Sequence, residues 1–247
     1  MRVIASYNIK GGVGKTSTAV NLAYLAAREG SRTLLWDLDP QAAATFLFRV
    51  RPRVKGGSRG LVTRRRPVED AVKATDFDNL DLLPADFSYR TMDLELDDTK
   101  KPTRRLGQLL SEVADDYDIA FLDCPPSVSL VSENVLRAAD VLLVPLIPAT
   151  LSLRTYAQLT RFIADAPRPR PDVVAFFSMA DRRKRLHRDV IDALPRDHGP
   201  RIADTIVPSM ALIEQMAERR APVPAYAPTS TAAKCYEQLW AEVSNRS

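Results

Sequence analysis

Short apolar runs alternate with longer stretches of helical periodicity along most of the chain. Several runs, such as VLLVPL at 141–146, are apolar at consecutive positions, which is typical of strands buried on both faces of a parallel sheet. The predicted strands cover residues 3–7, 33–37, 80–84, 119–123, 141–146, 173–177 and 202–207. The predicted helices cover residues 15–29, 103–116, 128–138, 152–166, 184–194, 210–219 and 230–243. The alternation predicts an α/β fold, a single domain with a mostly parallel twisted sheet flanked by helices.

Composition agrees with a globular chain that buries its own core. Of the 247 residues, 45% are hydrophobic and 27% are charged, and the two cysteines are too few for a disulfide framework or a four-ligand metal site. The longest apolar run, 141–153, is shorter than the roughly 20 residues needed to span a bilayer, and two prolines interrupt it. We therefore expect a cytoplasmic protein.

The formal net charge of +4 conceals a strong local asymmetry. Residues 49–66 contain seven arginines, one lysine and no acid, whereas residues 67–98 contain ten acids and only two basic residues. A third run, 182–188, adds five basic side chains. Dense basic clusters favour a polyanionic partner, with nucleic acid as the first candidate, although a solvated surface is the simpler interpretation of each.

A cluster of glycines follows the first predicted strand and precedes the first predicted helix. Gly11, Gly12 and Gly14 are followed by Lys15 and Thr16 in the string KGGVGKT. Glycines allow backbone N–H groups to surround phosphate oxygens, and the helix N-terminus adds further donors. The strict pattern G-x-x-x-x-G-K-[ST] does not fit, because its first glycine would fall on Ile9. The match is to the deviant Walker A motif.

Aspartates end two of the predicted strands. Asp37 and Asp39 lie in LLWDLDPQ, and Asp123 ends the run YDIAFLD. Ligands of open α/β sheets bind at the carboxyl ends of strands, so we expect the three carboxylates to converge on the glycine loop.

These motifs together resemble the ParA/Soj partition ATPases, within the ParA/MinD group of deviant P-loop ATPases. The similarity extends over nearly the whole chain, through segments 10–23, 34–41, 80–85, 117–127, 139–159, 205–209 and 225–243. It implies the deviant P-loop NTPase fold, with ATP and Mg²⁺ as the bound groups.

The resemblance also implies a role for each matching residue. Lys10 would be the signature lysine, which reaches across a nucleotide-sandwich dimer to the phosphates of the other subunit. Lys15 and the amides of the loop would hold the phosphates within one subunit. The loop residues concerned are Gly11, Gly12, Val13, Gly14, Lys15, Thr16 and Ser17.

The same resemblance supplies the rest of the site. Thr16 would ligate Mg²⁺ directly, and Asp37 and Asp123 would hold it through water molecules. Asp39 would orient or activate the attacking water, and Pro208 would line the adenine pocket.

At the level of function, the resemblance implies a slow ATPase that forms an ATP-dependent homodimer and binds DNA without sequence preference. A ParB-like or other cargo-adaptor protein would stimulate hydrolysis, and the protein would be cytoplasmic and associated with the nucleoid. The cargo stays open between a plasmid or chromosome locus and a protein assembly.

The chain departs from the family at positions that concern DNA binding. Ala42-Ala43 stands where Gly-Asn is usual, and no arginine follows the late proline strand. We therefore expect DNA contacts on the 182–188 run, with help from two later arginines. The residues concerned are Arg182, Arg183, Lys184, Arg185, Arg188, Arg219 and Arg220. For 49–66, we expect a basic loop insertion that is flexible and exposed.

Two other functions fit parts of the sequence. A MinD-like membrane ATPase would need a basic amphipathic helix at the C-terminus, but CYEQLWAEVSNRS carries two glutamates and one arginine, which is more typical of a packed helix. A nucleotide-gated scaffold with negligible turnover would share every motif above. Because the first strand begins at residue 3, we expect no N-terminal helix-turn-helix domain.

Overall fold

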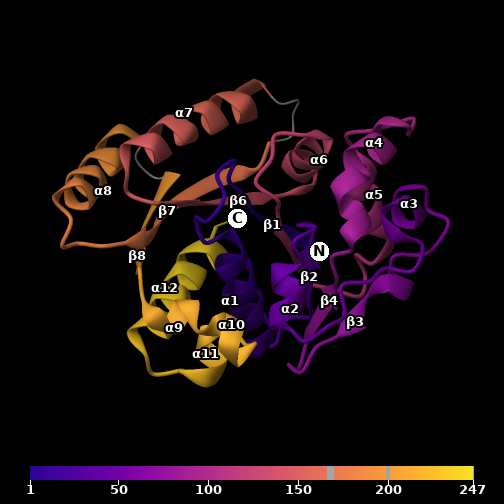
Figure 1. The fold of residues 1–247 in the computed structure, drawn as a ribbon, viewed down its shortest axis with the longest axis horizontal. Helices are drawn as coiled ribbons and strands as arrows, with labels where there is room; N and C mark the ends of the chain where they lie inside the picture. Colours follow the sequence, from indigo (N-terminus) through magenta and orange to yellow (C-terminus); the bar gives the residue numbers. More distant parts are fainter. Residues whose placement is uncertain (166–169, 199–200, 247) are drawn as a thin grey trace.

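One mixed β-sheet runs through the middle of the molecule (Figure 1). The computed structural model describes residues 1–165, 170–198 and 201–246, and in these residues eight strands have the order β3-β4-β2-β5-β1-β6-β7-β8. The strands are β1 (Arg2–Ser6), β2 (Thr33–Asp37), β3 (Lys73–Ala74), β4 (Leu80–Leu83), β5 (Ile119–Asp123), β6 (Val141–Leu146), β7 (Asp172–Ala180) and β8 (Ile202–Pro208). All neighbouring strands are parallel except β3, which pairs antiparallel with β4. The predicted mostly parallel α/β fold is confirmed.

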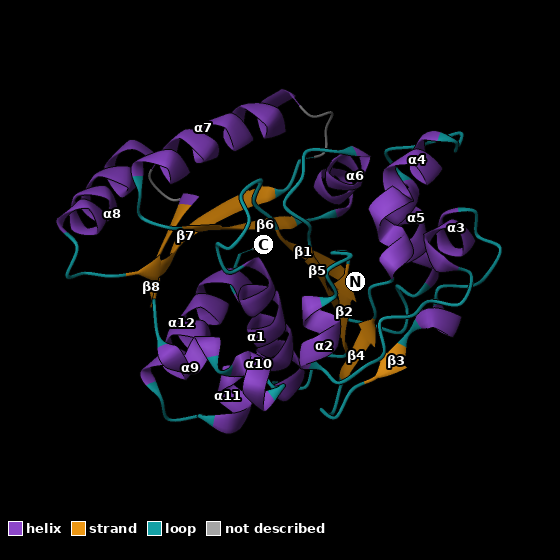
Figure 2. Ribbon diagram, viewed as in Figure 1, coloured by secondary structure: helices purple, strands orange, loops and turns teal. Residues whose placement is uncertain are grey.

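Helices cover both faces of this sheet (Figure 2). One layer consists of α1 (Lys15–Arg28), α2 (Ala43–Leu47), α9 (Ala211–Glu214), α10 (Met216–Arg219), α11 (Val223–Tyr226) and α12 (Thr231–Ser244). The other consists of α3 (Gly57–Val62), α4 (Met92–Asp97), α5 (Arg105–Glu112), α6 (Leu130–Ala138), α7 (Thr150–Asp165) and α8 (Arg185–His198). Two short 3₁₀ turns, η1 (Glu69–Ala71) and η2 (Phe87–Thr91), lie in the same part of the chain as α3 and α4.

The continuous apolar strands are explained by these two helix layers. In β1, Val3 and Ala5 pack into one core, while Ile4 between them packs into the other. Because successive side chains of a strand point to opposite faces, a strand covered on both sides needs apolar residues at every position.

The register of the central strands determines where the polar strand ends meet. In the β2–β5 pair Asp37 lies opposite Asp123, and in the β1–β5 pair Ser6 lies opposite Asp123. The glycine loop leaves β1 directly after Ser6. The parallel arrangement therefore gathers two carboxylates and the loop at one edge of the sheet.

The C-terminal helix is part of the core. Tyr236, Leu239, Trp240 and Val243 of α12 are buried, and the Trp240 indole donates a hydrogen bond to Glu29 at 2.7 Å. These contacts confirm the interpretation of the C-terminal segment as a packed helix. The described residues include no helix with the length and apolar character required to cross a bilayer.

The segment 49–66 differs from the flexible loop that we expected. It contains α3, and it buries Val54, Leu61 and Val62 against the rest of the chain. With only six residues, α3 is too short to show a helical period in the sequence. The expectation of a flexible, exposed segment is therefore wrong for its backbone and its apolar side chains.

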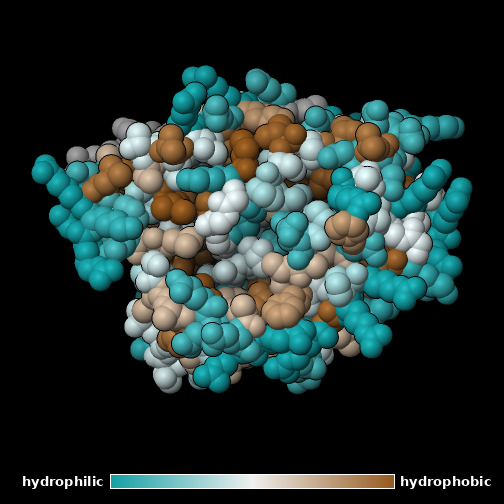
Figure 3. Space-filling view, in the orientation of Figure 1, coloured by the Kyte–Doolittle hydropathy of each residue, from teal (hydrophilic) through white to brown (hydrophobic). Residues whose placement is uncertain are grey.

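Other element boundaries also differ from the prediction. The sequence pattern did not indicate β3, α2 or α4, and the predicted helix 210–219 is divided into α9 and α10. Residue 166, at the end of the predicted helix 152–166, lies outside the described residues. On the surface, hydrophilic side chains gather at both ends of the long axis (Figure 3), where Figure 1 places α8 at one end and α3 with α4 at the other.

One departure from the family pattern leaves a strained backbone. Ala42, the N-cap of α2, has φ 57° and ψ 34°, in the left-handed region that costs an L-residue about 1–2 kcal/mol. Ala42→Gly should relieve this strain and offset the greater freedom of glycine in the unfolded chain, for a net gain of about 0.5 kcal/mol in unfolding free energy. Urea denaturation measures the gain.

The matched control for this prediction is the neighbouring residue. Ala43 is exposed in the first turn of α2, so Ala43→Gly should lower the unfolding free energy by about 0.5–1 kcal/mol. Equal losses in both variants would show that the Ala42 conformation carries no strain.

Candidate functional site

A cavity of about 360 Å³ opens where the glycine loop meets the carboxyl ends of the strands. It receives side chains from the loop, from the residues after β2 and β5, from the ends of β7 and β8, and from α12. Its lining is Gly11, Gly12, Gly14, Lys15, Thr16, Ser17, Asp39, Pro126, Ser178, Met179, Val207, Pro208, Ser209, Met210, Ile213, Glu214 and Tyr236. Eight of the predicted site residues therefore share one cavity.

Two glycines of the loop are required by its shape. Gly12 and Gly14 have φ of 69° and 91°, a region in which other residues are strained. A Cβ on Gly14 would also lie 2.7 Å from the Ser178 hydroxyl, too close for two non-bonded atoms. The loop therefore brings its backbone against β7 in a conformation that leaves its amides available to a ligand.

The loop lysine lies folded against its own backbone. Lys15 Nζ donates to the Lys10 carbonyl at 3.1 Å, and the Ser6 hydroxyl donates to the Lys15 carbonyl at 2.9 Å. Lys15 is only 7% exposed, and burial lowers the pKa of its ammonium group, against the opposing influence of Asp123. A partly desolvated cation in this position gains free energy from an anion placed in the loop.

Asp123 is a buried carboxylate without a hydrogen-bond partner. It is fully buried, and neither oxygen accepts a hydrogen bond from the described residues. Burial and the nearby charge of Asp37 raise its pKa well above the usual range. The Thr16 hydroxyl, which is near Asp123 but does not form a hydrogen bond of normal geometry with it, and the Lys15 ammonium act in the opposite direction. A buried, unpaired carboxylate is costly unless a cation or donor completes it.

Asp37 and Asp39 have separate surroundings. Asp37 accepts from the amide and the hydroxyl of Thr45 at 2.8 and 2.7 Å, which attaches α2 to the end of β2. Burial raises the pKa of Asp37 to about 6, although these hydrogen bonds favour its ionised form. Asp39 instead lines the cavity, and its Oδ1 accepts from the Gln41 amide at 2.9 Å.

A tyrosine that the sequence did not single out holds the segment after β5. The Tyr7 hydroxyl donates to the Ser127 carbonyl at 2.6 Å, and burial raises the pKa of Tyr7 to about 12. This contact places Pro126 at the cavity edge, where its Cγ would lie 3.9 Å from a Cβ on Gly11. Tyr7 follows β1 directly and is buried like any other core residue, so sequence alone gives no signal for it.

The part of the cavity lining outside the loop is mixed. Five of its side chains are largely apolar, and the polar Ser178, Ser209 and Glu214 lie among them. The five are Met179, Pro208, Met210, Ile213 and Tyr236. A cavity that combines the N–H donors of a glycine loop with apolar side chains suits a nucleotide, which has both phosphates and an aromatic base. Pro208 was the only one of these five identified from the sequence.

Known proteins resemble the chain over its full length. Residues 1–170 match the AAA domain family. The chain is 31% identical to the sporulation initiation inhibitor protein Soj of Bacillus subtilis, over 98% of each chain. It is 32% identical to the chromosome partitioning protein ParA of Caulobacter vibrioides, over 100% of this chain and 95% of ParA. The chain belongs to the ParA/Soj family of partition ATPases.

Solved structures share the fold of this chain. Cobyrinic acid a,c-diamide synthase from Mycobacterium smegmatis, with a bound ATP analogue and magnesium, is 26% identical and has a TM-score of 0.82, covering 98% of this chain and 93% of that chain. The cell division ATPase MinD of Pyrococcus furiosus shares the fold, with a TM-score of 0.77 at 22% identity and 98% coverage of both chains.

Two predicted residues of the loop do not line the cavity. Val13 is buried beneath the loop. Lys10 is half-buried, its amide donates to the Asn8 side chain at 2.9 Å, and its own side chain makes no hydrogen bond or ion pair with the described residues. In this ParA/Soj chain, Lys10 is therefore free to act outside its own cavity.

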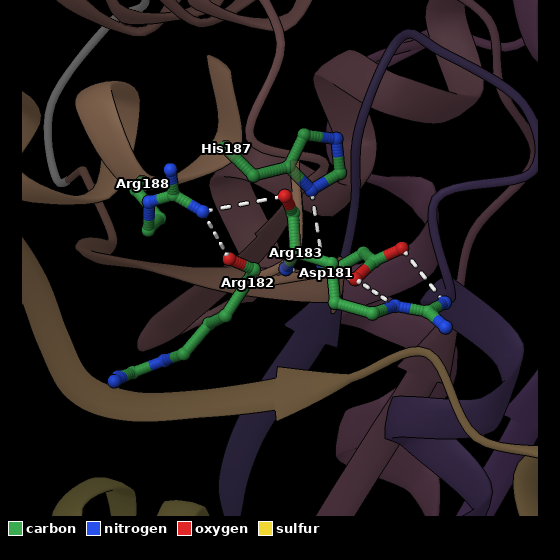
Figure 4. Close-up of polar contacts among 5 residues, drawn as sticks. All are labelled: Asp181, Arg182, Arg183, His187 and Arg188. Atoms are coloured by element: carbon green, nitrogen blue, oxygen red, sulfur yellow. Dashed lines mark hydrogen bonds and ion pairs between the residues drawn. The ribbon is translucent and has the colours of Figure 1, made fainter. Parts of the chain in front are cut away.

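The basic run 182–188 covers the turn between β7 and α8 together with the first residues of α8, and its own side chains hold it together (Figure 4). We call this segment the 182–188 turn. Asp181 accepts from the amide and the guanidinium of Arg183, and these bonds hold the pKa of Asp181 down at about 2. The Asp181 amide donates to His187 Nδ1 at 3.0 Å, and Arg188 donates to the carbonyls of Arg182 and Arg183. His187, which had no role in the sequence analysis, anchors this turn.

The turn uses some of its cations internally and leaves others available. Arg183 and Arg188 make the contacts above, and Arg185 lies 3.7 Å from Asp189. The side chains of Arg182 and Lys184 are exposed and make no hydrogen bond or ion pair with the described residues. An anion can therefore bind these two cations without breaking an existing hydrogen bond or ion pair of their side chains.

The two later arginines are not joined to this turn. Arg220 donates to the Phe46 carbonyl at 3.0 Å, and its guanidinium lies 4.5 Å from the centroid of the Phe46 ring. The Arg219 carbonyl accepts from Arg49 at 3.3 Å. Arg220 therefore has a structural use, attaching α10 to α2.

The unpaired carboxylate predicts a conflict between stability and function. Asp123→Asn removes a buried charge and should raise the unfolding free energy of the ligand-free protein by about 1–3 kcal/mol at pH 8. The folded-state pKa of Asp123 is raised, so its penalty exists above that pKa and disappears as the pH falls toward the unfolded value. The gain should therefore shrink at pH 5, as measured by thermal or urea unfolding.

A surface aspartate provides the control. Asp118 is exposed and paired with Arg32 at 2.8 Å, so Asp118→Asn should bring no gain at either pH. A destabilised Asp123→Asn protein at pH 8 would contradict the cost assigned to the buried charge.

Proposed function

We propose that this chain is a ParA-type ATPase, which closes as a dimer over ATP, binds DNA without sequence preference and positions a cargo with an adaptor protein. The observation that supports the proposal best is the juxtaposition of the desolvated Lys15 and the unpartnered Asp123 behind a glycine loop. That arrangement is unfavourable without a bound ligand, and a phosphate chain with its cation relieves both charges at once.

Mg²⁺ and ATP fit the residues at this place. Thr16 lines the cavity, and Asp123 has two buried oxygens that lack donors, so the donor set is hydroxyl and carboxylate oxygen, as Mg²⁺ prefers. The described residues contain no group of three or more His, Cys, Asp or Glu side chains that would hold a metal ion by themselves. Thr16, Asp37 and Asp123 would therefore hold the ion together with phosphate oxygens and water. When bound, the ion supplies charge neutralisation at the phosphates.

The chain's own residues supply the rest of the chemistry. The amides of the loop and Lys15 bind and orient the phosphates within the subunit. Asp39 lies at the cavity with Oδ2 free of hydrogen bonds from the described residues, so it can accept a proton or a hydrogen bond from an attacking water. The apolar side chains around Pro208 hold the adenine ring of ATP.

Lys10 is the residue that we propose acts on the nucleotide of a second subunit. Its side chain lies outside the cavity of its own chain, although its backbone belongs to the loop. In a sandwich dimer it would neutralise phosphate charge in the other subunit, which makes closure dependent on the γ-phosphate. Hydrolysis would then loosen the dimer.

Two substitutions separate these roles. Lys10→Ala should abolish hydrolysis and the ATP-dependent dimer while retaining part of the nucleotide affinity. Asp39→Ala should lower turnover by about 10²-fold or more yet retain a stable ATP-bound dimer. Phosphate release and size-exclusion chromatography with ATP and Mg²⁺ measure both effects. Lys15→Ala, the binding control, should lose the nucleotide, and normal turnover in either test variant would contradict the assignment.

DNA binding is proposed for the 182–188 turn, where Arg182 and Lys184 are the accessible cations. Arg183, Arg185 and Arg188 would contribute to its positive field, with Arg219 and Arg220 outside the turn. The double variant Arg182→Gln/Lys184→Gln should weaken duplex binding and reduce the slope of log affinity against log salt by up to about 2.

The control removes the same charge elsewhere. Lys100 and Lys101 are exposed and have no side-chain hydrogen bond or ion pair with the described residues, so Lys100→Gln/Lys101→Gln tests net charge alone. Fluorescence anisotropy with a random duplex measures both. Equal slopes for the two variants would refute the placement on the turn.

A further inference from the structure

The basic segment 49–66 is built on a folded support. Here we call the exposed cations Arg51, Arg53, Lys55, Arg59 and Arg65 the basic platform. The support beneath them is α3, which contacts η2, α4 and α5. Because the backbone is already ordered by these contacts, a ligand does not have to order a loop before it binds.

Hydrogen bonds and a close backbone approach fix the support in place. Asp86 accepts from the Val54 amide at 2.8 Å and from both the amide and the hydroxyl of Ser88. Ser58 binds Ser88 twice, through its amide at 2.8 Å and its hydroxyl at 3.1 Å. A Cβ on Gly57 would lie 2.7 Å from the Ser88 hydroxyl. The absence of a side chain at Gly57 therefore permits this contact.

Neighbouring acids do not neutralise the platform. Glu112 is occupied by Arg64 at 2.6 Å, and Asp76 is occupied by Arg49 at 2.9 Å. Asp86, which faces Arg53, already accepts the three hydrogen bonds described above. The side chains of the remaining cations make no hydrogen bond or ion pair with the part of the chain that the structure describes. They are Arg51, Lys55, Arg59 and Arg65.

The composition of the surface identifies the class of ligand. Val54, Leu61 and Val62 point into the core and are nearly completely buried, so the segment offers no bulky apolar side chain for insertion into lipid. Three of the four unpaired cations are arginines, whose guanidinium groups match phosphate oxygens in geometry.

We propose that the basic platform is a second phosphate-backbone contact for duplex DNA, separate from the 182–188 turn. The two surfaces lie at opposite ends of the molecule, with α3 beyond the β3–β4 edge of the sheet and α8 beyond the β8 edge (Figures 1 and 3). The proposal rests on the DNA binding proposed above and adds to it a contact on the other side of the ATP cavity. One subunit then contacts two separate stretches of DNA backbone.

The test compares five proteins with a random-sequence duplex across a salt series, in ATP and Mg²⁺. They are wild type, the platform variant R51Q/K55Q/R59Q/R65Q, the turn variant R182Q/K184Q, the combination of these two variants, and the control K100Q/K101Q/R154Q/R161Q. Arg154 and Arg161 are exposed on α7 and have no partner among the described residues, so the control matches the platform variant in net charge. Melting curves verify that each protein is folded.

The platform variant should lose affinity for the duplex and reduce the slope of log affinity against log salt by up to about 4, well beyond the control. In the protein that also lacks the Arg182 and Lys184 charges, the losses in binding free energy should add. A platform variant that behaves like the control overturns this inference, while the 182–184 result still reports on the proposed function. No binding by wild type would instead defeat the proposed function itself.

Two further measurements cover a misfolded variant and a different ligand. Photocrosslinking of wild type to bromouracil-substituted duplex should yield DNA-linked peptides from 49–66, and their absence while 182–188 is labelled overturns the proposal. If the platform variant keeps its DNA slope but loses binding to polyglutamate, the platform is a docking surface for an acidic protein and the proposal is wrong.

Discussion

The cost of burying charge at the end of a parallel sheet controls the architecture of the site. Asp37 and Asp123 lie opposite each other on adjacent strands, both fully buried, and Lys15 is almost as deeply buried beside them. One ammonium group does not balance two carboxylates in a low-dielectric interior. Burial is the main cause of the raised pKa of both acids, and repulsion from neighbouring carboxylates adds to it. The fold tolerates the imbalance because the surrounding strands and helices supply a large apolar core. What would balance the site is a ligand that carries both a cation and an anion.

This constraint explains why the sequence predicted the site so well. A glycine loop between a strand and a helix, and aspartates that end strands, are local patterns, and the parallel register brings them together without further information. The other half of the cavity could not be predicted in this way. Met179, Met210 and Tyr236 come from three separate elements, and each is an ordinary apolar residue in its local pattern. Only the packing of β7, β8 and α12 makes them neighbours.

The same distinction applies to the fold. Continuous apolar strands and long amphipathic helices were predicted because their periodicity is strong over many residues. Short elements such as β3 and α3 were not, because a few residues carry no period. In α3 the stabilising contacts are tertiary, with Ser58 and Ser88 joined across the chain and Asp86 tying the preceding strand-like segment down. A basic composition indicated solvent exposure, which is correct for the arginines and wrong for the valines and leucine between them.

The two basic regions differ in how many of their cations are already paired within the protein. In the turn after β7, Asp181 and the backbone carbonyls consume Arg183 and Arg188, so that only part of the apparent charge is available to a partner. On the basic platform the nearby acids are occupied by other groups, so most of the charge remains available. Counting charges along the sequence ranks the two regions by density alone. The hydrogen-bond partners show instead how many cations each region leaves unpaired. By that measure the basic platform is as suitable a surface for phosphate as the 182–188 turn.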